Sequence, residues 1–498
     1  SNLNEEEVAK ILSIRYKYDG LDVTASLLRK YPYKEITHHV LGHVGYIDKK
    51  DLSSLDKKKY RNMQYIGKTG VEKFYENELY GNPGYKHVEI NARGRQLRDL
   101  DIGYAEPGED IHLTIDIELQ KFMFDALSKY SGSSIALNPN TGEILGMVSL
   151  PSIDPNDRLW KYGFEQEELE KLKSPLFNRS INGLYSPGST IKPIVALSAL
   201  ENKIVSPSFK VKCTGKMELY GQTFHCWKEK GHGFVSLKNA MKQSCDTYFY
   251  EVARLLGVDR LNVTAEKFGL GKKVLGDYFD FEKSGLFPNT KWKKNNLGKG
   301  WVLGETLITG IGQGYTQTTP LQLCLMTAQI ANGGYSIKPR IIVDNNPMPI
   351  EEIKRKLKEE TLHTQEKKLF NDPRNIKIVQ EAMFSSTNEL YGTSYKSRID
   401  DPKYQFAGKT GTAQVKRISM RERELDLKIE QIPYKDRDHA LYIAYGPYIN
   451  PRYALSIIVE HGGSGSRTAA PIAKELFKLI IDRNDLRNKQ KNFEEIKI

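Results

Sequence analysis

The sequence predicts an α+β protein in which one antiparallel sheet is flanked by helices. Two strand-like segments at 134–137 and 144–148 are separated by an Asn/Pro/Gly turn, which is typical of a β-hairpin. A helix-rich region follows and continues to about residue 332. Apolar segments of strand length then return at 440–445 and 453–459. Strands, then helices, then strands again favour the α+β class.

Three further elements are expected around this sheet. Residues 110–115 alternate between polar and apolar side chains, as a half-buried strand does. Asp116 follows directly and is a suitable N-cap for an amphipathic helix. A last helix is expected from about Pro471, because apolar side chains recur there at helical spacing, at Ile472, Leu476, Leu479 and Ile480.

The polar, turn-rich start of the chain predicts a separate and smaller domain. It is rich in Lys and Tyr and is interrupted by turn signals such as residues 80–84. The loop at 104–109 is the expected boundary. We therefore expect an N-terminal pedestal domain at residues 1–108, a main domain at 109–485 and a polar C-terminal tail at 486–498.

Composition limits the classes of partner. The chain has 498 residues and a formal net charge of +12, which suits an acidic polymer or an anionic surface. The basic residues are spread along the chain without a long run, so we expect no nucleic-acid binding. No stretch has the length and apolar character of a membrane span. The chain begins with Ser1 rather than Met, and we expect that an N-terminal membrane anchor preceded it.

The first chemical motif is a serine three residues before a lysine. Ser189 and Lys192 lie in Ser186-Pro187-Gly188-Ser189-Thr190-Ile191-Lys192-Pro193, and this spacing puts both side chains on one face of a helix. The amide groups at a helix N-terminus favour negative charge beside such a serine. A lysine whose pKa is lowered by burial can accept the proton of the serine hydroxyl. The pair therefore predicts a nucleophile with its base.

Two more motifs follow in a fixed order. Ser244-Cys245-Asp246 supplies a hydroxyl and a carboxylate, and Lys409-Thr410-Gly411-Thr412 supplies a charge and two hydroxyls that suit a carboxylate ligand. Gly411 would let a ligand backbone approach the strand edge closely. The ordered set Ser-x-x-Lys, Ser-x-Asn/Asp and Lys-Thr-Gly marks serine β-lactamases and penicillin-binding proteins.

On these motifs the chain resembles the class B penicillin-binding proteins. Within them it is most similar to the penicillin-binding protein 2 branch, the cell-elongation transpeptidases of Gram-negative bacteria. Asp246 stands where the wider superfamily has Asn, and an Asp there is familiar in this branch. Further matching segments are Asn91–Arg95, Thr141–Leu145, Pro151-Ser152, Asp154–Asn156, Asn178-Arg179, Gly312–Tyr315, Thr319–Gln322 and Asp438–Ala440.

The resemblance implies a mechanism for these residues. Lys192 would deprotonate Ser189, which would attack the penultimate D-alanine of a pentapeptide stem. Backbone N–H groups of Ser189 and Thr412 would form the oxyanion hole. Ser244 would pass a proton to the leaving D-alanine, with Lys409 nearby. Asp246, in the same motif as Ser244, would be a further catalytic residue. The terminal carboxylate would be held by Thr410 and Thr412. β-Lactams would acylate the same serine, and the amine of a second stem would resolve the acyl-enzyme.

The resemblance also implies an architecture and a setting. The main domain would be a transpeptidase domain of the penicillin-binding and serine β-lactamase type, on a smaller pedestal. It would act at the periplasmic face of the bacterial inner membrane. The chain leaves no room for a glycosyltransferase domain, so the implied partners are a membrane glycosyltransferase of the elongation machinery and a scaffold protein.

Three cysteines and a histidine form a possible metal site. Cys213, Cys226, His232 and Cys245 make a Cys3His set, which suits a structural zinc with four protein ligands. The spacing of Cys226, His232 and Cys245 matches a zinc arrangement in related elongation enzymes. A Cys213–Cys226 disulfide, a merely buried Cys245 or a ligand role for His225 are the alternatives. Cys324 lies in an apolar helix and is expected in the core.

Other functions with the same fold stay open at this point. A β-lactamase or a D-alanyl-D-alanine carboxypeptidase would put water on the acyl-enzyme, and a non-catalytic β-lactam sensor would keep acylation without turnover. The long N-terminal domain argues against a simple β-lactamase. The intact Ser244 and Lys409 motifs argue against a sensor. A P-loop is excluded at residues 67–70 and 408–410, because the required upstream glycine is missing.

Overall fold

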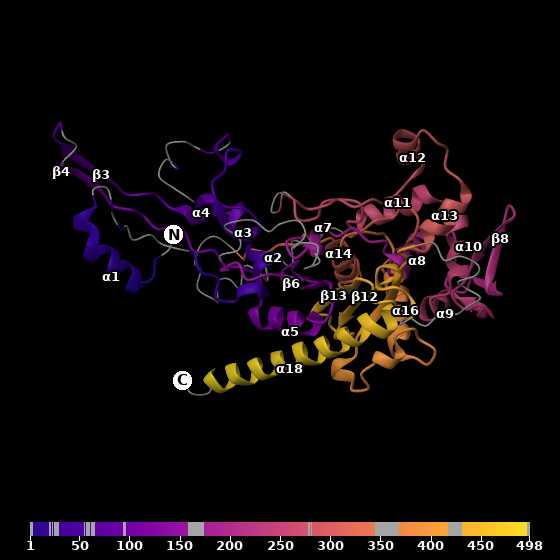
Figure 1. Ribbon diagram of the computed structural model, residues 1–498. Helices are drawn as coiled ribbons and strands as arrows, with labels where there is room; N and C mark the ends of the chain where they lie inside the picture. The colour runs from indigo at the N-terminus through magenta and orange to yellow at the C-terminus, as the bar shows by residue number, and fades with distance from the viewer. Residues whose placement is uncertain are drawn as a thin grey trace.

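The computed structural model describes residues 3–18, 21, 23, 29–53, 55, 60, 65–92, 96–157, 174–276, 279, 281–343, 368–416 and 431–495. Figure 1 shows a slender N-terminal part joined to a larger globular part, with both chain ends on the side of the slender part. The charge-rich segment 354–367 and residues 93–95, at the end of the pedestal, lie outside the described residues. Among the described helices we find none with the length and apolar character of a membrane span.

The slender part consists of short helices and two antiparallel strand pairs, β1–β2 and β3–β4. Its long hairpin β3–β4 contains two register shifts and extends away from the rest of the molecule (Figure 1). Its elements are α1 (Glu5–Ile14), α2 (His38–Leu41), β1 (Val44–Tyr46), β2 (Tyr65–Gly67), α3 (Gly70–Phe74), α4 (Glu76–Tyr80), β3 (Tyr85–Ile90) and β4 (Gln96–Gly103).

The larger part is built on one antiparallel sheet of order β11-β12-β13-β5-β6, which confirms the predicted fold class. Its strands are β5 (Gly132–Leu137), β6 (Ile144–Leu150), β11 (Ala407–Ala413), β12 (His439–Gly446) and β13 (Tyr453–Val459). The predicted early hairpin pairs β5 with β6, and β13 brings the late strands alongside β5. One edge of the sheet is therefore β11, which carries the Lys-Thr-Gly motif.

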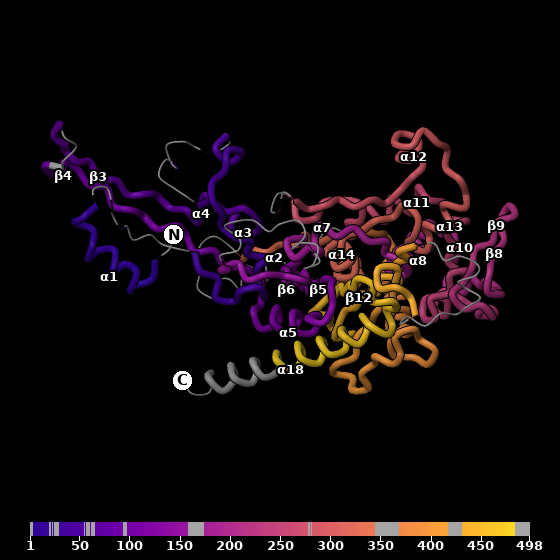
Figure 2. The backbone as a smooth tube through the Cα atoms, viewed as in Figure 1, coloured from indigo at the N-terminus to yellow at the C-terminus, as the bar shows by residue number. Residues whose placement is uncertain are grey.

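Helices cover both faces of this sheet. One buried cluster joins the sheet to α8 (Lys192–Glu201), α10 (Asp246–Leu256), α14 (Pro320–Ala331) and α16 (Pro373–Asn388). A second joins the opposite face to α5 (Ile117–Leu127) and to α18 (Ala470–Glu495). Asp116 caps α5 by accepting from the amides of Glu118 and Leu119, as predicted. Residues 486–495 of the polar tail continue α18. The first part of α18 lies beside α5, as Figure 2 shows.

The remaining elements surround the Ser-x-x-Lys and Ser-x-Asp motifs. Two small two-stranded sheets pair β10 with β7 and β8 with β9. The sequence did not predict these strands. These elements are α7 (Arg179–Asn182), β7 (Lys210–Cys213), β8 (Lys216–Leu219), β9 (Gln222–His225), β10 (Gly233–Ser236), α9 (Leu237–Lys242), α11 (Val258–Lys267), α12 (Thr290–Leu297) and α13 (Leu303–Gly310).

One predicted strand is wrong. Residues 110–115 form no regular strand; instead Leu113 makes a single antiparallel bridge to Ile342. The hydroxyl of Thr114 donates to the carbonyl of Ile144 at 2.7 Å, which ties the segment to the end of the sheet. The apolar side chains of Ile111, Leu113 and Ile115 are only partly buried, and the polar Thr114 between them is buried, so the alternation in the sequence does not mark a strand in a ladder.

Candidate active site

The nucleophile motif begins a helix, but through a tighter turn than expected. Ser189 lies in the 3-10 turn η5 (Gly188–Ile191), and Lys192 is the first residue of α8. A 3-10 turn has 3.0 residues per turn, so side chains three apart still project to the same side. Ser189 is half-buried and Lys192 is fully buried. The motif thus presents its serine to the surface and its lysine to the interior.

Glycines bring this turn against the edge strand β11. Gly188 has a φ of +53°, and a Cβ there would lie 2.5 Å from the carbonyl oxygen of Thr412. A Cβ on Gly411 would lie 2.7 Å from the Cγ2 of Thr190. In this structure the glycine of the Lys-Thr-Gly motif therefore makes room for the Ser189 turn, where the sequence had suggested room for a ligand. Both glycines are required for the two motifs to meet.

The second motif is held in an unusual backbone conformation at the centre of the site. Ser244 is a non-glycine residue with a φ of +55°, and Asp246 begins α10 two residues later. The buried ammonium group of Lys192 donates to the Ser244 carbonyl at 2.9 Å, to the Ser244 hydroxyl at 3.2 Å and to a carboxylate oxygen of Asp246 at 2.7 Å. These contacts fix the left-handed turn, which costs roughly 1–3 kcal/mol by itself.

The third motif supplies a second buried lysine to the same hydroxyl. Lys409 on β11 donates to Ser244 Oγ at 2.8 Å and to the Thr410 carbonyl at 3.0 Å. Its burial, together with the nearby positive charge of Lys192, holds the pKa of Lys409 well below its ordinary value. Asp246 is the only carboxylate that ion-pairs with either lysine among the described residues, and it pairs with Lys192. The ion pair with the carboxylate therefore lies at Lys192, and Lys409 is the lysine whose charged form is disfavoured.

The two threonines of the third motif differ in their surroundings. Thr410 is buried and donates from its hydroxyl to Thr393 Oγ1 at 2.9 Å, whereas Thr412 is half-buried. Gln313 donates from its side-chain amide to the Thr412 carbonyl at 3.1 Å. Because β11 is an edge strand, its outward amides and carbonyls do not pair with β12 and can receive an extended peptide.

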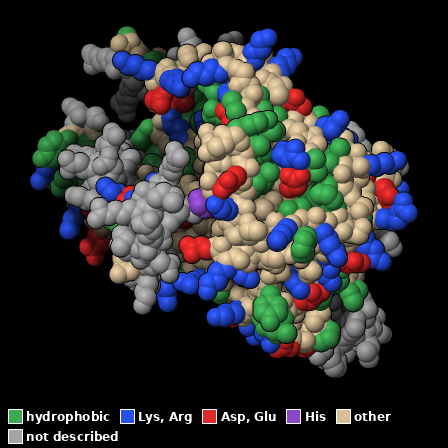
Figure 3. All heavy atoms as spheres, turned by 90° about the vertical axis from the view of Figure 1, so that its right-hand side faces the viewer, with side chains coloured by type: hydrophobic (Ala, Val, Ile, Leu, Met, Phe, Trp, Pro, Cys, Tyr) green, Lys and Arg blue, Asp and Glu red, His purple; other side chains and the backbone are tan. Residues whose placement is uncertain are grey.

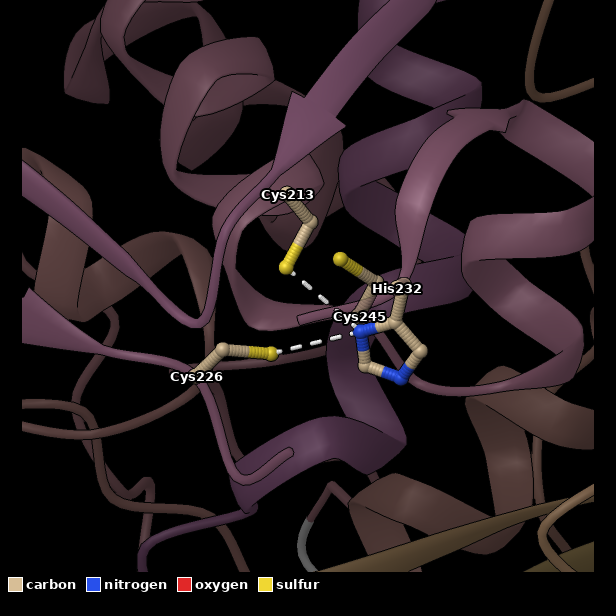
Figure 4. A group of neighbouring side chains, drawn as sticks. All are labelled: Cys213, Cys226, His232 and Cys245. Carbon is tan, nitrogen blue, oxygen red and sulfur yellow. Dashed lines mark hydrogen bonds between the residues drawn. The ribbon is translucent and has the colours of Figure 1, made fainter. Parts of the chain in front are cut away.

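The structure also brings the four predicted metal ligands together, as Figure 4 shows. The Sγ atoms of Cys213, Cys226 and Cys245 and a ring nitrogen of His232 all lie within 4.8 Å of one another. His225 lies outside this group, and all three cysteines are free thiols rather than a disulfide.

The spacing of these atoms suits a tetrahedral ion. Cys213 Sγ and Cys226 Sγ lie 3.5 Å and 3.6 Å from His232 Nδ1. Zn–S and Zn–N bonds of about 2.3 and 2.0 Å in a tetrahedron separate sulfur from nitrogen by about 3.5 Å. A hydrogen bond from Cys245 also holds the pKa of Cys226 far below its ordinary value, and a thiolate is the form that binds metals. The donor set therefore fits zinc.

Sequence reasoning missed a residue that links this cluster to the active-site motif. Trp227 follows Cys226, and its backbone amide donates to a carboxylate oxygen of Asp246 at 3.0 Å. Its indole N–H lies 3.0 Å from the carbonyl oxygen of Gln243 and 3.1 Å from that of Ser244. Its position directly after a predicted ligand was the only available signal. Gln313 and Thr393 were likewise not assigned to the site.

Cys324 is core, as expected. Its thiol is fully buried and points at the carbonyls of Ile135 and Ala454 at 3.6 and 3.4 Å. Tyr315, which follows the Gly-Gln-Gly turn, is partly exposed and packs against Trp292 with ring centroids 5.3 Å apart.

Comparison with known proteins decides the family. Residues 132–478 match the family model described as the penicillin binding protein transpeptidase domain. The chain belongs to the penicillin-binding transpeptidases. Residues 1–113 of this penicillin-binding protein match a second family model, the penicillin-binding protein dimerisation domain. The predicted family, fold class and enzyme class are thereby confirmed.

Relatives place this penicillin-binding protein near one branch. It is 36% identical over 484 residues to the peptidoglycan D,D-transpeptidase MrdA of Acinetobacter baumannii, covering 95% of this chain and 69% of the relative. It is 34% identical over 497 residues to MrdA of Escherichia coli K12, covering 97% of this chain and 75% of the relative.

Solved structures of penicillin-binding protein 2 are also similar to this chain. Penicillin-binding protein 2 of Pseudomonas aeruginosa, solved with WCK 5153, gives a TM-score of 0.75 at 36% identity and covers 91% of this chain and 90% of its own. Penicillin-binding protein 2 of Helicobacter pylori, in a complex with MreC, gives a TM-score of 0.81 at 29% identity and covers 97% of this chain and 84% of its own.

Proposed function

We propose that this chain is a peptidoglycan D,D-transpeptidase that cross-links stem peptides in cell elongation through an acyl-enzyme on Ser189. The observation that carries the proposal is the convergence of Lys192 and Lys409 on the hydroxyl of Ser244. Ser189 lies one turn before Lys192, in the segment that packs against the edge strand β11. Relatives with the name peptidoglycan D,D-transpeptidase support the same reaction and substrate.

Ser244 would first prepare the base. Lys192 forms the ion pair with Asp246, and Lys409 is the lysine with the lowered pKa. Lys192 would give a proton to Ser244 Oγ while the Ser244 hydroxyl proton moves to Lys409 Nζ. The amine of Lys192 would then accept the proton of Ser189, whose oxygen would bond to the carbonyl carbon of the penultimate D-alanine.

Collapse of the tetrahedral intermediate would use the hydroxyl of Ser244 again, now to carry a proton from Lys409 to the leaving group. The bond from the carbonyl carbon to the terminal D-alanine nitrogen would break, and Ser244 would deliver a proton held by Lys409 to that nitrogen. Backbone amides of Ser189 and Thr412 would stabilise the oxyanion, and the hydroxyls of Thr410 and Thr412 would bind the terminal carboxylate. The neutral amine of a second stem would then bond to the ester carbonyl carbon, the bond from that carbon to the Ser189 oxygen would break, and the proton lost by the amine would pass to the Ser189 oxygen.

We also propose that Cys213, Cys226, His232 and Cys245 hold a structural zinc. The matching sulfur–nitrogen distances and the cysteine-rich donor set support this assignment. Four protein ligands would occupy all coordination positions of a tetrahedral zinc and leave none for a catalytic water. The ion would therefore cross-link the segment from β7 to β10 to the start of α10. Metal analysis of the purified chain tests the assignment, with one zinc per chain expected.

The pedestal is proposed to bind the partners of the elongation machinery at the periplasmic face of the inner membrane. The hairpin β3–β4 and the residue after it expose apolar side chains that the described part of the chain leaves open to solvent, namely Tyr85, Val88, Ile90, Leu97, Leu100, Ile102 and Tyr104. Such a surface suits a protein interface. One structural relative was solved with MreC, and another belongs to a peptidoglycan synthase complex, which favours a scaffold protein and a membrane glycosyltransferase as the partners.

The cross-linking reaction is tested with uncross-linked peptidoglycan strands and the partner glycosyltransferase. The proposal predicts dimeric muropeptides with one D-alanine released for each cross-link, and none with Ser189→Ala. Release of D-alanine without dimers would indicate a carboxypeptidase. Rapid turnover of penicillin would indicate a β-lactamase, and a stable adduct without either product would indicate a sensor.

A further inference from the structure

A strongly basic segment lies outside the active-site machinery. Residues 283–304, here called the basic projection, contain five lysines and no Asp or Glu. The segment includes α12, which protrudes from the top of the larger part in Figure 1, at the end far from the β3–β4 hairpin. In Figure 3, which faces this end, Lys and Arg side chains stand along the upper edge.

Most of this charge is not neutralised within the protein. Lys283, Lys291, Lys294 and Lys299 are exposed, and none of them forms an ion pair with a residue that the structure describes. The fifth lysine, Lys293, is buried and donates to both carboxylate oxygens of Glu305, at 2.5 and 2.7 Å.

Three acidic residues adjoin the projection among the described residues, and all three are engaged. Glu282 is buried and accepts from the amides of Val274 and Leu275. Glu305 pairs with Lys293. Asp259 accepts from the amide and the hydroxyl of Thr290 at the start of α12. The exposed lysines therefore form a field of one sign, which attracts anions over about 8 Å at physiological salt.

The projection is joined rigidly to the rim of the active site. Trp292 on α12 packs against Tyr315, and the indole of Trp301 donates to Thr306 Oγ1 at 2.8 Å. Tyr315 ends the turn in which Gln313 donates to the carbonyl of Thr412 and Gly312 accepts from the amide of Gly188 at 2.8 Å. A ligand held by the projection would therefore be positioned relative to β11 and Ser189.

We propose that the basic projection is a binding surface for the carboxylate groups of stem peptides along a peptidoglycan strand, and that it guides the strand to the cleft. This inference rests on the proposed function, because the strand must be the substrate. Uncross-linked stems carry free carboxylates at regular spacing, which complements separate lysine ammonium groups. An exposed ion pair contributes a factor of up to about five in affinity, so three pairs together give a useful but salt-sensitive attachment.

The test compares two triple variants of the full chain with the same change of charge. Lys291, Lys294 and Lys299 are replaced by Glu in one variant. In the control, three exposed lysines away from the cleft, Lys121, Lys129 and Lys377, are replaced by Glu. A second test variant with Gln at the three projection positions separates lost attraction from added repulsion.

Binding is measured by fluorescence anisotropy with labelled, uncross-linked peptidoglycan strands at low and at physiological salt. The proposal predicts at least tenfold weaker binding for the Glu variant, a smaller loss for the Gln variant and a change below twofold for the control. Strands whose carboxylates have been amidated should bind the unmodified chain as weakly as normal strands bind the Glu variant. The rate of acylation by penicillin should be equal in all four proteins.

Three outcomes would overturn the inference. Peptidoglycan strands could bind the Glu variant as tightly as the unmodified chain. Amidated strands could bind the unmodified chain as tightly as normal strands. The Glu variant could lose binding only to vesicles of phosphatidylglycerol and phosphatidylcholine, which would make the projection a membrane-binding surface. Failure of the proposed function is recognised separately, because the unmodified chain would then form no penicillin adduct on Ser189.

Discussion

Trp227 offers a quantitative test of how the Ser-x-Asp motif is positioned. Its indole N–H bonds to the carbonyls of Gln243 and Ser244 at 3.0 and 3.1 Å, while 59% of the side chain is exposed. Trp227→Phe removes this donor and keeps an aromatic ring. The Ser244 carbonyl is not left unpaired, because Lys192 still donates to it. The change therefore weakens the support of the left-handed turn without removing it.

The expected loss follows from the value of one hydrogen bond. A hydrogen bond contributes about 0.5–1.5 kcal/mol net, and the exposure of Trp227 favours the middle of this range, about 1 kcal/mol. If the whole loss falls on the acylation transition state, the rate falls about fivefold. Since Trp227 does not contact the site proposed for the ligand carboxylate, the apparent affinity for penicillin should hardly change.

The assay is stopped-flow or quenched acylation by a fluorescent penicillin over a range of concentrations, which separates the maximal rate from the affinity. We expect a three- to tenfold lower maximal rate for Trp227→Phe, with zinc content retained. Tyr220→Phe is the matched control, since it removes one O–H from an 85% exposed aromatic residue on the neighbouring β8–β9 turn. A wild-type maximal rate in Trp227→Phe, or an equal loss in the control, would refute the positioning role.

Three other substitutions test separate parts of the site. Gly188→Ala should abolish acylation, because its Cβ would lie 2.5 Å from the Thr412 carbonyl oxygen; normal acylation, measured by penicillin labelling, would contradict the packing argument. Cys226→Ser should lower the zinc content and the midpoint of thermal unfolding, by several degrees, as measured by metal analysis and calorimetry; equal zinc would remove Cys226 from the ligand set. Lys409→Met tests the lowered pKa of Lys409. Because the unfolded chain binds this proton more tightly, stability should rise with pH from the folded pKa of Lys409 up to about 10.5, and the substitution should flatten this rise in urea titrations. An unchanged slope would show that Lys409 keeps an ordinary pKa.

The sequence predicted the features that depend on local pattern. The β5–β6 hairpin, the Asp116 cap and the C-terminal helix appear as expected. The three motifs come together in one site, although Ser189 lies in a 3-10 turn rather than in the helix itself. Each of them is encoded in a few neighbouring residues. The Cys3His group was also found in this way, since the types and spacing of its residues are visible in the chain.

Features that depend on distant contacts could not be read from the chain. Residues 110–115 have the alternation of a strand, yet they form only a single β-bridge, from Leu113 to Ile342. The proton roles of the two lysines follow from which one faces Asp246, a residue 54 positions from Lys192. The contact of Trp227 with Ser244 joins two loops whose approach depends on the short β7–β10 hairpins, and these strands are too short for a periodic signal.

Intact-mass spectrometry with penicillin tests the central claim most directly. The full chain is incubated with benzylpenicillin, followed over hours and mapped by peptide sequencing, beside the Ser189→Ala variant. The account predicts one lasting adduct per chain, located on Ser189 and absent from the variant. An adduct on another residue, or one that also forms in Ser189→Ala, would contradict it.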